Sequence, residues 1–173
     1  NRRPPYTDIN SFGQMPALVL DNGEIVTEIT AICEYLDETQ PGPSLIGSTA
    51  EERSQTRRWL RWVDLNICEP IGHGFRFGEG IDFFKERIRC VPEASQGFKA
   101  IAQDNIAFLD SQLANNEYLT GSKMTLVDVH LFCFLDFGRN RGQPLNDEFT
   151  HVGRWIAAME ARPSADASVL EDS

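Results

Sequence analysis

The sequence has few basic residues, few cysteines and no long apolar run. Its 16 Lys and Arg stand against 26 Asp and Glu, which gives a formal net charge of −10. This charge would repel a phosphate backbone and argues against nucleic acid as a partner. The longest apolar stretch, residues 129–137, is interrupted by His130 and Asp136 and is far shorter than the roughly 20 residues of a membrane-spanning helix. We therefore expect a protein with no nucleic-acid partner and no membrane span.

The four cysteines form no CxxC pair and lie apart in the sequence, at Cys33, Cys68, Cys90 and Cys133. Isolated thiols at apolar positions are typical of proteins in a reducing compartment, so we expect a cytoplasmic protein. No group of Cys, His and Asp has the spacing of metal ligands, and no GxxxxGK phosphate loop is present. The sequence therefore predicts no metal site.

With 173 residues, the chain is long enough for one ordinary domain or two small ones. Its first part predicts a β-hairpin over residues 16–26, because two short apolar runs flank Asn22-Gly23. Apolar residues at helical spacing then predict a helix that begins near Ile29 and ends before Pro41. A hairpin with one helix is only marginally stable, so this part must pack against something larger.

The remainder of the chain is predicted to be helical. Ser48 and Glu51 have the spacing of a capping box, and we expect the helix that they begin to end at Pro70. Residues 73–80 are expected to form a glycine-rich loop. Further helices are expected over residues 81–89 and 98–113, and from about residue 147 to residue 162.

One more helix should begin at Thr125, where Asp128 completes a capping box. The residues that follow, 129–135, are apolar on nearly every side. We therefore expect this helix to be surrounded by protein and to form the centre of the helical part.

Three segments, in this order, resemble cytosolic glutathione transferases: residues 13–36, which contain GQMPAL, DNG and TEITAICEYL; residues 119–128, LTGSKMTLVD; and residues 154–164. The resemblance implies an α/β thioredoxin-like domain, of which this chain carries the second half only (a β-hairpin plus a helix), followed by an all-α helical domain. It implies a glutathione-binding part at residues 1–40, a linker at 41–48 and a helical substrate domain at 49–173.

The resemblance also implies where glutathione binds. In this family the bond before the proline is cis, so that Met15 offers its main-chain N–H and C=O to the peptide-like ligand. By base rate the bond would be trans, and Pro16 would simply begin a strand. Glu28, at the start of the next helix, would bind the ligand's ammonium group, while the helix N-terminus holds a carboxylate. The implied glutathione-binding residues are Gln14, Met15, Pro16, Glu28, Ile29 and Thr30.

Two features of these candidates depart from the family or have an ordinary explanation. Ile29 stands where the family usually has a serine that binds the carboxylate, so Thr27 or Thr30 would have to replace that hydroxyl, or glutathione binding is weaker. An acidic residue in the first turn, such as Glu28, is also common in any helix.

An apolar pocket for the second substrate is implied by four residues: Trp62, His73, Phe75 and Phe77. An aromatic stripe at helical spacing is more often part of the core, and this alternative applies above all to Trp62 and its neighbour Trp59. His73 would assist proton transfer near neutral pH, or it is an ordinary loop histidine.

The function implied is that of a glutathione transferase, in which the thiolate of glutathione, the co-substrate, attacks a hydrophobic electrophilic small molecule in detoxification. The family's catalytic residue belongs to the opening strand-helix-strand that these residues lack, and the resemblance implies a homodimer. Three alternatives remain: a glutathione-dependent lyase, isomerase or ether-cleaving enzyme; a non-catalytic binding or assembly module, which Ile29 favours; and a helical carrier of hydrophobic ligands.

Overall fold

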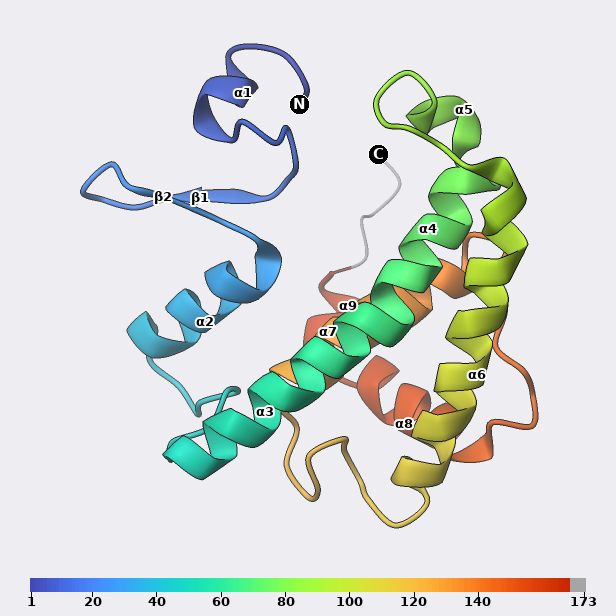
Figure 1. Ribbon diagram of the computed structural model, residues 1–173. Coiled ribbons are helices and arrows are strands. Elements are labelled where there is room, and N and C mark those ends of the chain that lie inside the picture. Colours follow the sequence, from blue (N-terminus) through green and yellow to red (C-terminus); the bar gives the residue numbers. More distant parts are fainter. Residues whose placement is uncertain (169–173) are drawn as a thin grey trace.

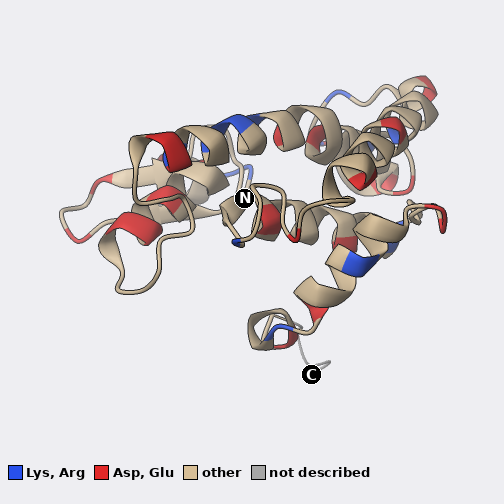
Figure 2. Cartoon of the chain, turned by 90° about the horizontal axis from the view of Figure 1, so that it is seen from below, with Lys and Arg blue, Asp and Glu red and all other residues tan. Residues whose placement is uncertain are grey.

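The computed structural model describes residues 1–168 and shows two units side by side (Figure 1). The N-terminal unit contains a short helix, a two-stranded sheet and a longer helix, which are α1 (Tyr6–Ile9), β1 (Ala17–Val19), β2 (Ile25–Thr27) and α2 (Ile29–Thr39). The second unit is helical and contains the main core. Acidic residues are spread along the chain (Figure 2), and they outnumber the basic ones. No helix within residues 1–168 is both long and apolar enough to cross a membrane.

The hairpin predicted for residues 16–26 is confirmed. Its strands are antiparallel and pair Ala17 with Thr27, Leu18 with Val26 and Val19 with Ile25. The turn is wider than a two-residue Asn-Gly turn, because the N–H of Leu20 donates to the Glu24 carbonyl across the loop. Gly23 has a φ of +86°, which a glycine adopts without steric cost. The other edge of β1 pairs with no strand among the described residues.

The segment between the two units is anchored to both of them. The Asp37 carboxylate on α2 accepts hydrogen bonds from the Ser44 hydroxyl (2.7 Å) and the Leu45 N–H (2.5 Å). The side chain of the next residue, Ile46, is buried in the core of the helical unit. Arg57 also forms a bidentate ion pair with Glu34 of α2. The two units are therefore held together by polar contacts as well as by packing.

The helix that follows begins one residue later than the sequence predicts. The capping box consists of Thr49 and Glu52, not of Ser48 and Glu51. The Glu52 N–H donates to Thr49 Oγ1, and the Glu52 carboxylate accepts from the main-chain N–H groups of Thr49 and Ser48 and from the Ser48 hydroxyl. The sequence offers two such pairs in adjacent registers, and the structure selects the one whose carboxylate gathers three donors.

The prediction that Pro70 ends this helix is wrong. Helix α3 (Ala50–Val63) continues through a π-helical segment, η1 (Asp64–Cys68), into α4 (Glu69–Phe77), and the three form one long diagonal ribbon (Figure 1). Proline lacks the N–H that an α-helix needs, and the wider π turn just before it accommodates that loss. The Glu69 N–H donates to the Asp64 carbonyl, while the Asn66 side-chain amide donates to the Trp62 carbonyl at 2.8 Å.

The loop expected over residues 73–80 is consequently helical as far as Phe77. Its glycines allow close packing of α4 against α6 (Ser95–Leu113) rather than flexibility. A Cβ added at Gly74 would lie 2.8 Å from Lys99 Cγ, and the Ser95 hydroxyl donates to the Gly74 carbonyl at 2.8 Å. Glycine content alone therefore gave the wrong prediction here, because the neighbouring helix occupies the space that a side chain would need.

The remaining helices agree in type with the prediction and differ in their bounds. The helix expected over residues 81–89 is one turn, α5 (Ile81–Phe84), because the N–H groups of residues 87 and 88 both turn back to the Phe84 carbonyl. A 3-10 turn, η2 (Pro92–Ala94), precedes α6. Helix α8 (Thr150–Glu160) begins three residues later than residue 147. At its start, the Asp110 carboxylate accepts hydrogen bonds from the N–H groups of residues 151 and 152. The last helix described is α9 (Pro163–Asp166).

Helix α7 (Leu126–Arg139) begins after Thr125 as predicted, but protein does not surround it. Val127, Leu131 and Leu135 lie in the core. On another face Cys133 is exposed and Phe134 is only half-buried within the described residues. The uniform apolar composition of this helix conceals a face that points out of the helical core, toward an apolar cavity described below.

The Asp128 carboxylate joins three parts of the helical unit. Its side chain is fully buried and accepts hydrogen bonds from the N–H groups of Leu119 and Thr125 and from Nε1 of Trp155, at 2.9–3.1 Å. Burial raises the pKa of this carboxyl, and the donors around it oppose that change. The capping residue therefore also fixes the preceding loop and α8.

Replacement of Asp128 by alanine is expected to lower the free energy of unfolding by about 3 kcal/mol, because three donors, two of them buried, lose their acceptor. Urea unfolding followed by circular dichroism measures this loss. The matched control is Asp104→Ala on the exposed side of α6, for which we expect a change within about 0.5 kcal/mol. Equal effects of the two substitutions would show that Asp128 is not a structural centre.

Candidate functional site

The segment that leads into β1 is held by the short helix before it. The Gln14 carbonyl accepts hydrogen bonds from the Tyr6 hydroxyl (2.6 Å) and from Asn10 Nδ2 (2.8 Å). The Met15–Pro16 bond is cis, as the resemblance implied. The Gln14 and Pro16 side chains are exposed, and the Met15 side chain is 68% exposed. These residues therefore present a fixed main chain at the surface.

The start of α2 has an unusual backbone. Glu28 precedes the helix with a φ of +69°, and within residues 1–168 it is the one residue other than glycine with a positive φ. A non-glycine residue in this region costs free energy and is most often found at functional sites. The Glu28 side chain is exposed, and so is that of Ile29, while Thr30 is half-buried. The first N–H groups of α2 have no carbonyl partner within the helix and point outward from its N-terminus.

The hairpin register brings these two segments together. Ala17 pairs with Thr27, so Pro16 and Glu28 are the next residues at the same end of the sheet. Directly opposed Cα atoms in antiparallel strands lie about 5 Å apart. The proline corner and the start of α2 therefore lie next to each other at this end of the sheet, and these two segments contain the predicted residues Gln14, Met15, Pro16, Glu28, Ile29 and Thr30.

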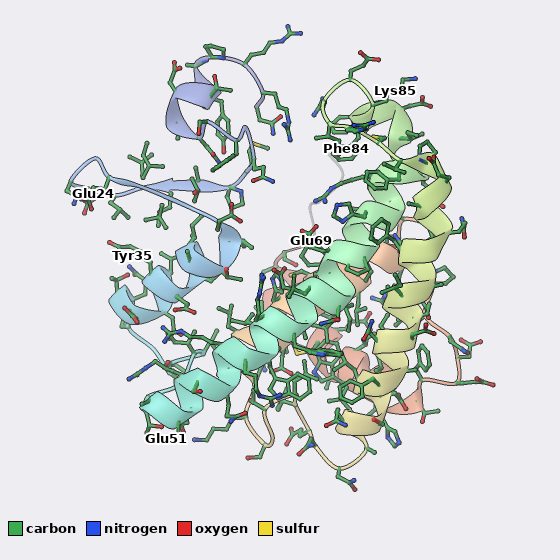
Figure 3. All side chains as sticks on the ribbon, in the orientation of Figure 1. Glu24, Tyr35, Glu51, Glu69, Phe84 and Lys85 are labelled. Atoms are coloured by element: carbon green, nitrogen blue, oxygen red, sulfur yellow. The ribbon has the colours of Figure 1, made fainter. Side chains whose placement is uncertain are left out.

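An apolar cavity of about 300 Å³ lies at one end of the helical unit. The ring of Phe75 packs edge-on against Phe137 (5.0 Å between centroids) and Phe84 (6.1 Å). Arg76 is the one charged residue in its lining, which consists of Gly72, Phe75, Arg76, Phe84, Cys133, Phe134 and Phe137. Figure 3 places Phe84 and Glu69 on the side of the helical unit that is nearer to the N-terminal unit.

The structure does not bring the four predicted pocket residues together. Phe75 lines the cavity, whereas Trp62 lies thirteen residues earlier on the same long helix, about 20 Å away along its axis. The Trp62 ring packs against Trp59, which belongs to the core, and against Phe108 of α6. The ordinary explanation of these two tryptophans as packing residues therefore fits their positions.

His73 and Phe77 face α6 rather than the cavity. The imidazole stacks on Phe98 (5.0 Å) and contacts Phe77 at 5.2 Å. Its Nδ1 lies 2.8 Å from the Glu69 carbonyl and 3.2 Å from the Glu69 carboxylate. Sequence reasoning missed Phe84, Phe134 and Phe137 as lining residues. For Phe134 and Phe137, the sequence signal for a lining position was that the aromatic residues of α7 do not all fall on one face of the helix.

Three of the cysteine thiols are poor nucleophiles at neutral pH. Burial raises the pKa of Cys33 and of Cys133, and it raises the pKa of Cys68 most strongly, with the nearby carboxylates of Asp64 and Glu69 adding to the effect. The reactive form of cysteine is the thiolate, and a raised pKa reduces its population. None of these three thiols therefore has the environment of an activated catalytic cysteine.

Comparison with known protein families identifies both parts of the chain. Residues 1–39 match the family described as "Glutathione S-transferase, N-terminal domain", and residues 97–163 match "Glutathione S-transferase, C-terminal domain". The chain belongs to the glutathione transferase family. Its fold, a small antiparallel sheet with helices followed by an all-helical part, is the glutathione transferase fold.

Its relatives carry different names. The chain is 31% identical to "Protein LigF" of Sphingobium sp. (92% of this chain, 74% of that protein) and 27% identical to "FtsZ-localized protein A" of Caulobacter vibrioides (92% and 72%). It is 28% identical to "Elongation factor 1-gamma" of Prunus avium and spans only 37% of that protein's length. A glutathione S-transferase domain-containing protein from Marinobacter aquaeolei has a similar crystal structure, with a TM-score of 0.85, 28% identity, and 95% of this chain and 80% of that chain covered.

The cavity predicts where hydrophobic molecules bind. An anilinonaphthalene sulfonate dye should bind beside Phe137, because the cavity offers aromatic rings and the cation of Arg76. We expect Phe137→Ala to weaken dye binding about fivefold, which corresponds to about 1 kcal/mol of lost apolar contact. Fluorescence titration measures this change. Phe12→Ala, which removes an exposed ring outside the cavity, is the control, and a larger effect from this control would place the dye elsewhere.

Proposed function

We propose that the chain is the glutathione-binding and substrate-binding part of a glutathione transferase. In this proposal glutathione lies along the surface formed by Met15, Pro16 and the start of α2, and a hydrophobic electrophile occupies the cavity beside Phe75. The observation that carries the proposal is the hairpin register, which places the proline corner and the helix N-terminus at one end of the sheet. We assign residues 1–40 to glutathione binding, 41–48 to a linker and 49–173 to the substrate domain.

Each part of the ligand would meet a group of matching chemistry. The main-chain N–H and C=O of Met15 would pair with the tripeptide as a neighbouring strand does. The N–H groups of Ile29 and Thr30 at the start of α2 would bind the γ-glutamyl carboxylate, helped by the positive end of the helix dipole. The exposed Glu28 carboxylate would bind the adjacent ammonium group, and the Gln14 side chain would reach the glycine carboxylate.

The reaction would be attack by the glutathione thiolate on an electrophilic carbon in the cavity. Placing the two reactants side by side supplies much of the rate gain in such a reaction. The aromatic lining would hold the apolar part of the electrophile. Phe75 is the one predicted pocket residue that also lines the cavity. A glutathione-dependent lyase, isomerase or ether-cleaving enzyme would use the same binding surface with different chemistry. We assign no metal to this reaction.

A second candidate function, a binding or assembly module, is favoured by Ile29. Its side chain is 43% exposed at the point where a hydroxyl would complete the carboxylate site. Without that hydroxyl the site keeps its main-chain donors and loses one hydrogen bond, about 1 kcal/mol of affinity.

The four cysteines are free, which fits the reducing cytoplasm that we propose for either function.

Charge reversal at Glu28 tests the glutathione site. We expect Glu28→Lys to weaken glutathione binding at least tenfold, because the carboxylate that binds the ligand's ammonium group is replaced by a cation. Isothermal titration calorimetry measures the affinity, and circular dichroism verifies the fold. Glu24→Lys, the same change in the exposed hairpin turn, is the matched control and should bind glutathione as the parent does.

Two outcomes of this titration separate the candidates. Equal affinity of the parent and Glu28→Lys would show that the start of α2 is not the binding site. Retention of the parent on immobilised glutathione with release by free glutathione, but no conjugation of an aromatic electrophile by the full-length protein, would favour the binding module over the transferase.

We also propose a homodimer, supported by an exposed apolar stripe on the helical unit. Ile101 and Phe108, seven residues apart on α6, are 47% and 44% exposed, and the Phe108 ring packs against Trp62 of α3. We expect Ile101→Glu to shift the protein from dimer to monomer, because a charge would enter the apolar interface. Sedimentation velocity measures the mass. Ala100→Glu, at an exposed position outside this stripe, is the control, and an unchanged mass of the Ile101 variant would refute this interface.

A further inference from the structure

Three side chains of metal-ligand type meet where the long helix crosses α7. The carboxylate of Asp64, Sγ of Cys68 and a ring nitrogen of His130 all lie within 4.8 Å of one another. Asp64 and Cys68 are the first and last residues of the π-helical segment η1, and His130 is on α7, which packs against η1. No metal-ligand spacing is visible in the sequence, because His130 is 62 residues from Cys68 and no local signal marks the π turn.

Ordinary packing explains this group only in part. His130 Nε2 lies 3.4 Å from Asp64 Oδ1, which is longer than a good hydrogen bond. Cys68 is fully buried, and its Sγ lies within 4.8 Å of the Asp64 carboxylate and of the His130 ring nitrogen. The π turn that contains Asp64 and Cys68 is a rare structure and is frequently found at functional sites. A buried sulfur thus lies beside an imidazole and a carboxylate that are joined by one long hydrogen bond.

We propose that Asp64, Cys68 and His130 bind a single Zn²⁺ ion, with a solvent molecule in the fourth position. Zinc accepts oxygen, nitrogen and sulfur ligands in one site, whereas Mg²⁺ and Ca²⁺ prefer oxygen alone. With bonds of about 2.0–2.3 Å, a tetrahedral zinc ion has its ligand atoms about 3.3–3.8 Å apart. The three atoms therefore need to approach by at most about 1.0–1.5 Å, within the range of side-chain rotamer changes.

Burial and access also fit an ion with an open coordination position. Cys68 and His130 are buried, while the Asp64 side chain is 35% exposed and borders on solvent. An ion would enter past Asp64 and displace the Cys68 proton on binding. The bound ion would connect η1 to α7 and thereby fix the long helix against the central helix. This site is separate from the proposed glutathione surface, since none of its ligands belongs to residues 1–40.

Cobalt is the spectroscopic probe for this site. Co²⁺ titrated into the reduced full-length protein should bind at one equivalent and produce a thiolate-to-cobalt charge-transfer band in the near ultraviolet. Zn²⁺ should displace it. We expect Cys68→Ser to lose the band, and Asp64→Asn and His130→Gln to weaken Co²⁺ binding at least tenfold. The matched controls, Cys90→Ser and His73→Gln, should bind as the parent does.

Several outcomes would overturn the proposal. These are the absence of a charge-transfer band at stoichiometric Co²⁺, a band that persists in Cys68→Ser, and a band that instead disappears in Cys133→Ser. Because Cys68 and His130 are buried, their variants are verified by circular dichroism. The more exposed Asp64→Asn decides the matter if they do not fold, since unchanged affinity in this isosteric variant would exclude the carboxylate as a ligand and refute the site.

Discussion

The π-helical turn at Asp64–Cys68 lets one helix run from Ala50 to Phe77 across a proline, and the helical unit is organised around that continuity. Because the helix continues, Phe75 reaches the cavity and packs edge-on against the rings on either side of it. The same turn places Asp64 and Cys68 opposite His130. A helix that ended at Pro70 would not place Phe75 in the wall of the cavity.

The two units depend on each other through a few specific contacts. Asp37 of α2 binds the linker main chain, Ile46 enters the helical core, and Arg57 pairs with Glu34. A two-stranded hairpin with one helix has too little core to be stable alone. The proposed glutathione surface, which includes the strained residue Glu28, therefore depends on the helical unit for its stability. The helical unit supplies none of the proposed glutathione-binding residues.

Much of the fold could be predicted from local sequence signals. The hairpin at 16–26 and the capping of α7 by Asp128 follow from turn residues and capping residues that act over a few positions. What could not be predicted depends on distant neighbours. Gly74 is predicted to lie in a loop because the sequence does not show that α6 packs against it. Pro70 is predicted to end a helix because the sequence does not show the π turn before it. The hairpin register also brings together the two segments that contain the glutathione-binding candidates. Trp62, in contrast, packs against Phe108 of α6 and lies outside the cavity.

Hydrogen–deuterium exchange over residues 71–77 tests the continuity of the long helix most directly. If the helix passes through Pro70 and packs against α6, the amides of this segment are protected to a similar degree as those in the middle of α6. Exchange as fast as that of the turn at residues 78–80 would contradict the account, because the segment would then be the glycine-rich loop that its composition suggests.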